Sequence, residues 1–158
     1  MISVKRFAAN YIACRSVERL HYVEVTSGSV LNGVFPLEKE LAGTSFLNGV
    51  IWVVPAALGW EVADVWSRLT AIHQQMPDAS VPEMLKVLIG TLAVPTVGEL
   101  PAFHENSILD QDGINNEQAT YLPVQGKPVS LFLIRGIRLS AAEFGANNSG
   151  GNRYVERL

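Results

Sequence analysis

The sequence predicts one α+β domain spanning residues 1–158, in which a short-stranded antiparallel sheet packs against two or three helices. Three observations lead to this fold class. Asn-Gly pairs at 32–33 and 48–49, each flanked by apolar residues, are typical of tight hairpins. Apolar side chains at three- and four-residue steps over 59–76 indicate an amphipathic helix. A dense apolar run over 129–139 indicates a largely buried strand.

The two Asn-Gly pairs belong to a near-repeat, because 29–35 and 45–51 share Ser, Leu, Asn, Gly and Val at matching positions. A two-residue hairpin turn needs positive φ at both central positions, which Asn tolerates and Gly adopts freely. We therefore expect a meander with strands near 29–31, 34–37, 45–47 and 50–54. Two copies are too few for a repeat architecture, so the near-repeat serves only as an indication of turns.

The first third of the chain outside the near-repeat is less clear. Apolar residues at near-helical spacing favour an opening helix over 4–19, and a strand is the alternative. The β-branched and aromatic run His21–Thr26 predicts a strand, which the Ser27-Gly28 pair ends.

A second helix is predicted after the amphipathic one. Ser80 and Glu83 have the spacing of a capping box, with a proline inside the first turn. We expect this helix to run to 88 or 89 and to end at Gly90. Residues 91–128 are rich in Pro and Gly and predict loops, and the Gly/Asn segment 145–152 is predicted to be flexible.

Charge is scarce and unevenly placed. Charged residues make up 17% of the chain, against roughly 25% in typical soluble domains. Residues 1–20 carry +3, residues 21–134 carry −8 and residues 135–158 carry +2. Scarce charge suggests that part of the surface faces another protein copy, and a surface of uncharged polar residues is the alternative. A pI near 5.6 makes a nucleic-acid partner unlikely.

The single cysteine, Cys14, excludes an intrachain disulfide and a multi-cysteine zinc cluster. The apolar stretch 7–13 is short and interrupted for a signal peptide, and 46–60 is too short and interrupted to cross a bilayer. We therefore expect a soluble protein, cytoplasmic or particle-associated, without a membrane partner. No glycine-rich phosphate loop is present, and we expect no metal and no cofactor.

The catalytic candidates are weak and lie in the long loop. His104 and Glu105 combine a proton shuttle with a carboxylate, but adjacent residues rarely face each other. Asp110 and Asp112 begin an oxygen-rich stretch of candidate ligands, which fails the calcium-loop pattern because the first and twelfth positions are Ile108 and Ala119. A solvated turn is the simpler interpretation.

Aromatic and basic residues give the remaining candidates. Trp52 and Trp60 are candidates for a platform that binds a sugar or base, with burial or a subunit contact as the favoured alternative. Four arginines near the C-terminus are candidates for an interface with protein or nucleic acid: Arg135, Arg138, Arg153 and Arg157.

No motif specifies a reaction. The sequence therefore favours a non-enzymatic structural or assembly subunit of a homo-oligomer or larger particle, such as a virion component. The alternative is a small enzyme or ligand-binding domain with a loop site around His104 and Glu105.

Overall fold

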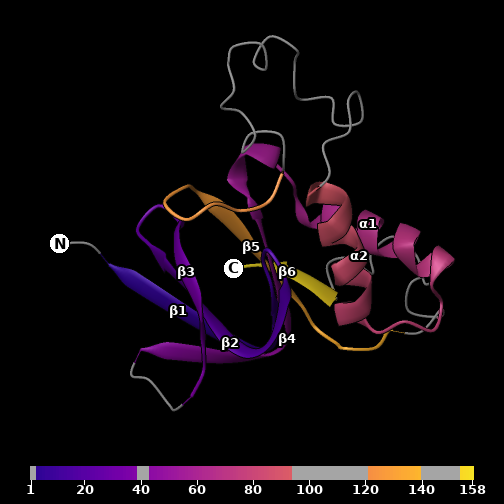
Figure 1. The fold of residues 1–158 in the computed structure, drawn as a ribbon, viewed down its shortest axis with the longest axis horizontal. Helices are drawn as coiled ribbons and strands as arrows, with labels where there is room; N and C mark the ends of the chain where they lie inside the picture. Colours follow the sequence, from indigo (N-terminus) through magenta and orange to yellow (C-terminus); the bar gives the residue numbers. More distant parts are fainter. Residues whose placement is uncertain (1–2, 39–42, 94–120, 140–153) are drawn as a thin grey trace, which may run out of the picture.

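The computed structural model describes residues 3–38, 43–93, 121–139 and 154–158. They form a six-stranded mixed sheet in the order β3-β2-β1-β4-β5-β6 together with two α-helices (Figure 1). The elements are β1 Val4–Ala13, β2 Val17–Thr26, β3 Val30–Pro36, β4 Thr44–Pro55, the 3-10 turn η1 Ala56–Leu58, α1 Val62–Gln75, α2 Val81–Ala93, β5 Val129–Ile134 and β6 Val155–Arg157.

The α+β class is confirmed, but the sheet is neither short-stranded nor purely antiparallel. β1 and β4 pair in parallel, and the other neighbours are antiparallel. β4 is 12 residues long, and β1 and β2 have 10 each. The helix expected over 4–19 is wrong, because these residues form β1 and the start of β2. Two partner strands satisfy the backbone of β1, which overrides its helical spacing.

Both Asn-Gly pairs lie inside strands, at bulges, instead of at hairpin turns. In β4, Asn48 and Gly49 together oppose the single residue Asn10 of β1. In β3, Asn32 is an extra residue relative to β2, because the register shifts between Glu24 and Val25. Asn and Gly favour tight turns because they can adopt positive φ. The same freedom also makes them suitable for a β-bulge. Gly49 uses this freedom, with φ +131°.

The sheet curls until β3 meets the residues that lead into β5. The Leu31 amide donates to the Lys127 carbonyl at 3.0 Å, and the Gly126 amide donates to the Leu31 carbonyl at 2.8 Å. Curling encloses an inner core to which five strands contribute. Its buried members are Ala9, Ile12, Cys14, Val23, Val25, Leu31, Ile51, Val53, Val129, Leu131 and Leu133.

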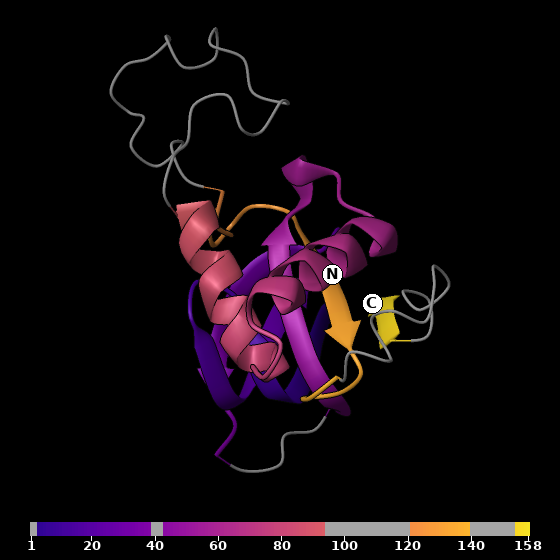
Figure 2. The same cartoon turned by 90° about the vertical axis from the view of Figure 1, so that its right-hand side faces the viewer.

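A second core lies between the outer face of the sheet and the helices (Figure 2). Trp52 and Phe132 from the sheet pack in one cluster with Leu69 of α1 and Met84 of α2, and all four are at most 1% exposed. Successive strand residues point to opposite faces, so Ile51 enters the inner core while Trp52 enters the outer one.

The helix predictions are largely confirmed. α1 occupies the predicted amphipathic segment. α2 begins at the predicted capping box, where the Ser80 amide donates to Glu83 Oε1 at 2.7 Å and the Glu83 amide donates to Ser80 Oγ at 3.3 Å. The hydrogen bond from the Ser80 amide lowers the pKa of the Glu83 carboxyl.

Two predicted boundaries are wrong. α2 continues through Gly90 to Ala93, because Leu92 in its last turn is buried in the outer core. The predicted strand 129–139 ends at Ile134, and Gly136 follows with φ +139°. Most of the predicted loop region and the flexible segment 145–152 lie outside the described residues.

Candidate functional site

Three aromatic side chains and one alanine form a row across the outer face of four strands. Tyr22 of β2 pairs with Phe35 of β3 on one side and with Ala8 of β1 on the other, and Ala8 pairs with Phe46 of β4. We call these four residues the aromatic row. Their sequence neighbours, including Phe7, Val23 and Val34, pack against the inner core, so the row faces outward.

The ends of the aromatic row are accessible. Phe35 is 37% exposed and Phe46 is 49% exposed, whereas Ala8 between them is fully buried. The Tyr22 and Phe35 ring centroids lie 5.5 Å apart. The Phe35 ring also lies over Gly33, where a Cβ would come within 2.6 Å of it. α1 contacts β6, and α2 contacts β4, β1 and β2. The β1 and β2 residues in the core beside the helices are Tyr11, Ala13 and Val17, which are not members of the aromatic row.

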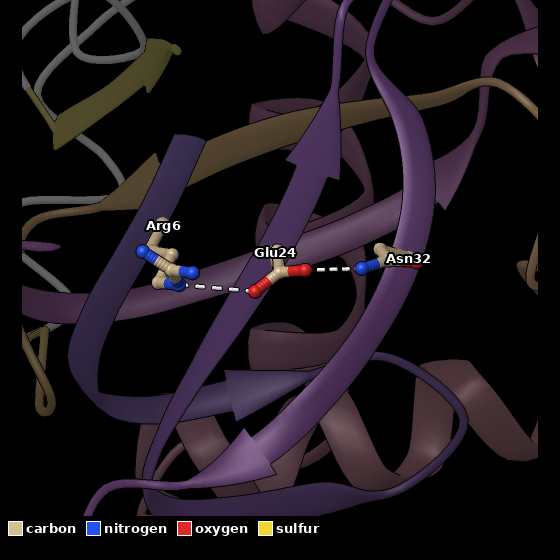
Figure 3. A network of polar contacts seen from close by, with 3 residues as sticks. All are labelled: Arg6, Glu24 and Asn32. Carbon is tan, nitrogen blue, oxygen red and sulfur yellow. Dashed lines mark hydrogen bonds and ion pairs between the residues drawn. The ribbon is translucent and has the colours of Figure 1, made fainter. Parts of the chain in front are cut away.

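A polar network lies next to the aromatic row (Figure 3). Arg6 Nε donates to Glu24 Oε1 at 3.0 Å, and the Asn32 amide donates to the other carboxylate oxygen of Glu24. Asn32 is the extra residue of the β3 bulge, so the bulge supplies one partner of this carboxylate. Because Arg6 and Glu24 compensate each other's charge, this part of the face is polar without a strong field.

An open groove of about 830 Å³ begins at the Phe46 end of the row. Its apolar lining includes Phe46, Leu47, Leu133, Ile137 and Leu158. Its polar lining includes an ion pair between Arg135 and Glu156, together with Asn10, whose Oδ1 accepts from the Gly49 amide at 2.8 Å. Phe46 belongs both to the aromatic row and to the groove lining, so an exposed apolar side chain joins the row to a groove with a mixed apolar and polar lining.

A smaller hollow of about 380 Å³ lies beside the turn between β1 and β2. Cys14, Glu18 and His21 contribute to its lining. Arg15 Nη1 donates to the Pro123 carbonyl at 2.7 Å, and the Ser16 hydroxyl donates to Glu18 at 2.6 Å. Burial raises the pKa of the Cys14 thiol to about 11, although the neighbouring Arg15 charge acts in the opposite direction. The thiol is therefore protonated at neutral pH and poorly suited to nucleophilic catalysis.

The Cys14 environment gives a testable prediction. Its pKa of about 11, against an ordinary 9.0, lowers the thiolate fraction at pH 8 by about 100-fold, so a disulfide reagent should label unfolded protein at least about 100-fold faster than native protein. The Cys14 thiol holds its proton to higher pH in the folded state than in the unfolded state. Its contribution to the free energy of unfolding is therefore fully present below about pH 9 and is lost as the pH rises toward about 11. Rapid labelling in native buffer would contradict this burial.

Both tryptophan candidates lie within the described residues, and both are buried. Trp52 and Trp60 are 1% and 7% exposed, and their rings meet edge to face at 5.4 Å. The Arg68 guanidinium lies 4.2 Å from the Trp60 ring centroid, so both indoles are occupied by internal contacts. The other catalytic and ligand candidates lie outside the described residues: His104, Glu105, Asp110 and Asp112.

Three of the four arginine candidates make contacts within the chain. Arg135 pairs with Glu156, Arg138 donates to the Asp78 carbonyl at 3.2 Å, and Arg157 donates to the Ser130 hydroxyl at 3.2 Å. Arg153 lies outside the described residues. Only Arg135 of the three lines the groove, so the structure does not gather them into one basic patch.

Within residues 3–38, 43–93, 121–139 and 154–158, no group of three or more His, Cys, Asp or Glu side chains is arranged to hold a metal ion. Neither helix of the described chain has the length and hydrophobicity needed to cross a bilayer.

No known protein-family model matches this chain, and no curated protein matches it significantly. Sequence reasoning missed the aromatic row because its members come from four strands whose registers are set by tertiary pairing. The alternation in 21–26 was the only available signal, and it marks one strand without identifying its neighbours.

Proposed function

We propose that this protein is a non-enzymatic structural subunit that associates with copies of itself, in a homo-oligomer or a larger particle such as a virion. The exposed ends of the aromatic row carry the proposal. Phe35 and Phe46 are large apolar side chains, 37% and 49% exposed, and Phe46 also lines the groove. Contiguous apolar surface with a polar rim is typical of protein–protein contact sites.

The low charge of the chain favours association between identical copies. No Asp, Glu, Lys or Arg occurs from 41 to 60, and charged residues form only 17% of the chain. The net charge of −3 is small, so two copies would repel each other weakly. The Arg6–Glu24 pair beside the aromatic row adds no net charge to it. A nucleic-acid partner is disfavoured, because nothing in this surface supplies a stripe of unpaired cations.

The alternative is a small enzyme or ligand-binding domain with a site around His104 and Glu105. Both residues lie outside the described part of the chain, so this alternative keeps only its sequence-based support. In the described part, the smaller hollow holds a protonated thiol, and both candidate tryptophans are buried. We therefore place the assembly role first.

Light scattering coupled to gel filtration tests the proposal. Across loading concentrations from about 1 to 100 μM, the mass should rise above the 17.2 kDa of one chain. Association driven by apolar surface should persist in 1 M salt, where surface ion pairs are screened. A mass of one chain at every concentration, in low and high salt, would refute self-association.

A further inference from the structure

β4 extends well beyond the strand that flanks it on the groove side. It pairs with β1 from Thr44 to Trp52, but with β5 only from Val50 to Pro55. Within the described chain, no strand therefore lies beside Thr44–Asn48 on the edge that faces the groove. We call Thr44–Asn48 the open edge. In a parallel ladder alternate peptide groups point away from the paired strand, so the described residues leave outward amide and carbonyl groups of the open edge without a partner strand.

Local geometry explains why β5 does not continue along β4. The Ile134 carbonyl oxygen lies so close to Gly49 that a Cβ there would come within 2.2 Å of it. Two residues later Gly136 has φ +139°, which redirects the chain away from a strand path. The β4 bulge and the end of β5 both border the groove, whose lining includes Phe46 and Leu47 of β4 and Leu133 of β5.

The open edge lacks the usual protection against strand addition. Edge strands of natural proteins are commonly short, or carry charges or proline. β6, at one end of the sheet, follows this rule, because it has three residues and contains Glu156 and Arg157. β3, at the other end, finishes in Pro36. The open edge reads Thr-Ser-Phe-Leu-Asn, with no charge and no proline.

The composition of the groove favours a second copy of this chain as the occupant. Antiparallel pairing of two open edges across a two-fold axis places the same uncharged residues opposite one another. The rim carries one cation and one anion, Arg135 and Glu156, which pair with each other, so the rim presents no net charge that would repel an identical copy. A strongly acidic or basic peptide would find no matching net charge here.

We infer that two copies of this chain pair through their open edges, forming one continuous sheet, with each Phe46 packed against the groove of the other copy. This inference rests on the proposed function and specifies the surface that performs it. Backbone hydrogen bonds would supply affinity, as in strand addition generally, and the Phe46 side chain would supply specificity. Phe46 is 49% exposed and Leu158 is 36% exposed, so both have apolar area to bury.

A matched pair of lysine variants tests the inference by sedimentation. Phe46→Lys puts a charge on the open edge, and Val87→Lys puts the same charge on α2, at an apolar residue that is 38% exposed. Phe46→Lys should weaken dimerisation at least about tenfold, and Val87→Lys should leave it unchanged. Circular dichroism melting of each variant checks that both fold.

The outcomes separate this inference from the proposed function. If wild type associates and both variants associate equally well, the open edge is not the interface, but the assembly role stands. If wild type is a monomer throughout, both fail. If Val87→Lys alone disrupts association, the interface lies on the helices and the open edge is again excluded.

Hydrogen exchange of the wild-type protein gives a readout independent of mutation. Amides of the peptide containing 44–48 should exchange more slowly as concentration rises through the dissociation constant, while those of α2, which does not line the groove, should not change. Slow exchange of 44–48 at every concentration, including those where the protein is monomeric, would mean that the same chain covers its own edge and would overturn the inference.

Discussion

Replacing Gly49 with alanine is expected to lower the free energy of unfolding by about 3 kcal/mol or more. The added Cβ would lie 2.2 Å from the Ile134 carbonyl oxygen and 3.2 Å from its carbon, and both atoms belong to the backbone of the neighbouring strand. The φ of +131° at Gly49 is also strained for any residue with a side chain. Relieving this clash would require β4 and β5 to move apart, although both strands contribute buried residues to the inner core and to the outer core.

Urea denaturation measures this loss against a matched control. Gly28 has φ +82°, but a Cβ there would meet no heavy atom within 4 Å. Gly28→Ala therefore reports the cost of positive φ alone, about 1 to 2 kcal/mol. Equal losses for the two variants would show that β4 and β5 do not approach as closely as described.

Truncating Trp52 to alanine should lower the free energy of unfolding by about 3 to 5 kcal/mol. Trp52 is 1% exposed in the outer core, and its ring meets Trp60 at 5.4 Å. The cavity would open between the sheet and the helices, where Leu69 and Met84 are fully buried. Differential scanning calorimetry or urea denaturation gives the value.

Phe46→Ala is the control for Trp52→Ala, because it truncates an aromatic residue on the same strand. Phe46 is 49% exposed, so its loss should change the stability of the isolated chain by no more than about 0.5 kcal/mol. Measured at a concentration where the protein is monomeric, similar losses for the two variants would contradict the division of β4 between core and open edge.

Local signals predicted the helices well. The capping box at Ser80 and Glu83 and the apolar spacing of α1 depend on residues within a few positions of one another, and both are present in the structure. Gly90 was misleading because its local preference to end a helix is outweighed by the burial of Leu92 one half-turn later.

Non-local pairing limited the rest of the prediction. β1 pairs with both β2 and β4. The β4 residues that pair with β1 lie about forty positions away in the sequence, and no local pattern predicts the pairing of β1 with β4. The Asn-Gly pairs predicted hairpin turns, but both pairs lie at register shifts inside strands. Whether such a position is a turn or a bulge depends on the neighbouring strand, as the pairing of Gly49 shows.

The aromatic row could not be predicted from the sequence, because it also depends on pairing between distant strands. Phe35 and Phe46 lie eleven positions apart in sequence, and they share a face only because β2 and β1 separate them in the sheet. The scarcity of charge indicated an associating surface, but only the strand registers show where exposed apolar residues gather. Tyr22, which joins the two ends of the row, had no distinguishing feature in the sequence.

Sedimentation velocity of the wild-type chain beside Phe46→Lys, at the same series of concentrations, tests the central claim most directly. We expect wild type to move from a 17.2 kDa species to larger ones as concentration rises, and the variant to make that transition at a concentration at least about tenfold higher. Superimposable profiles for the two proteins would contradict the account.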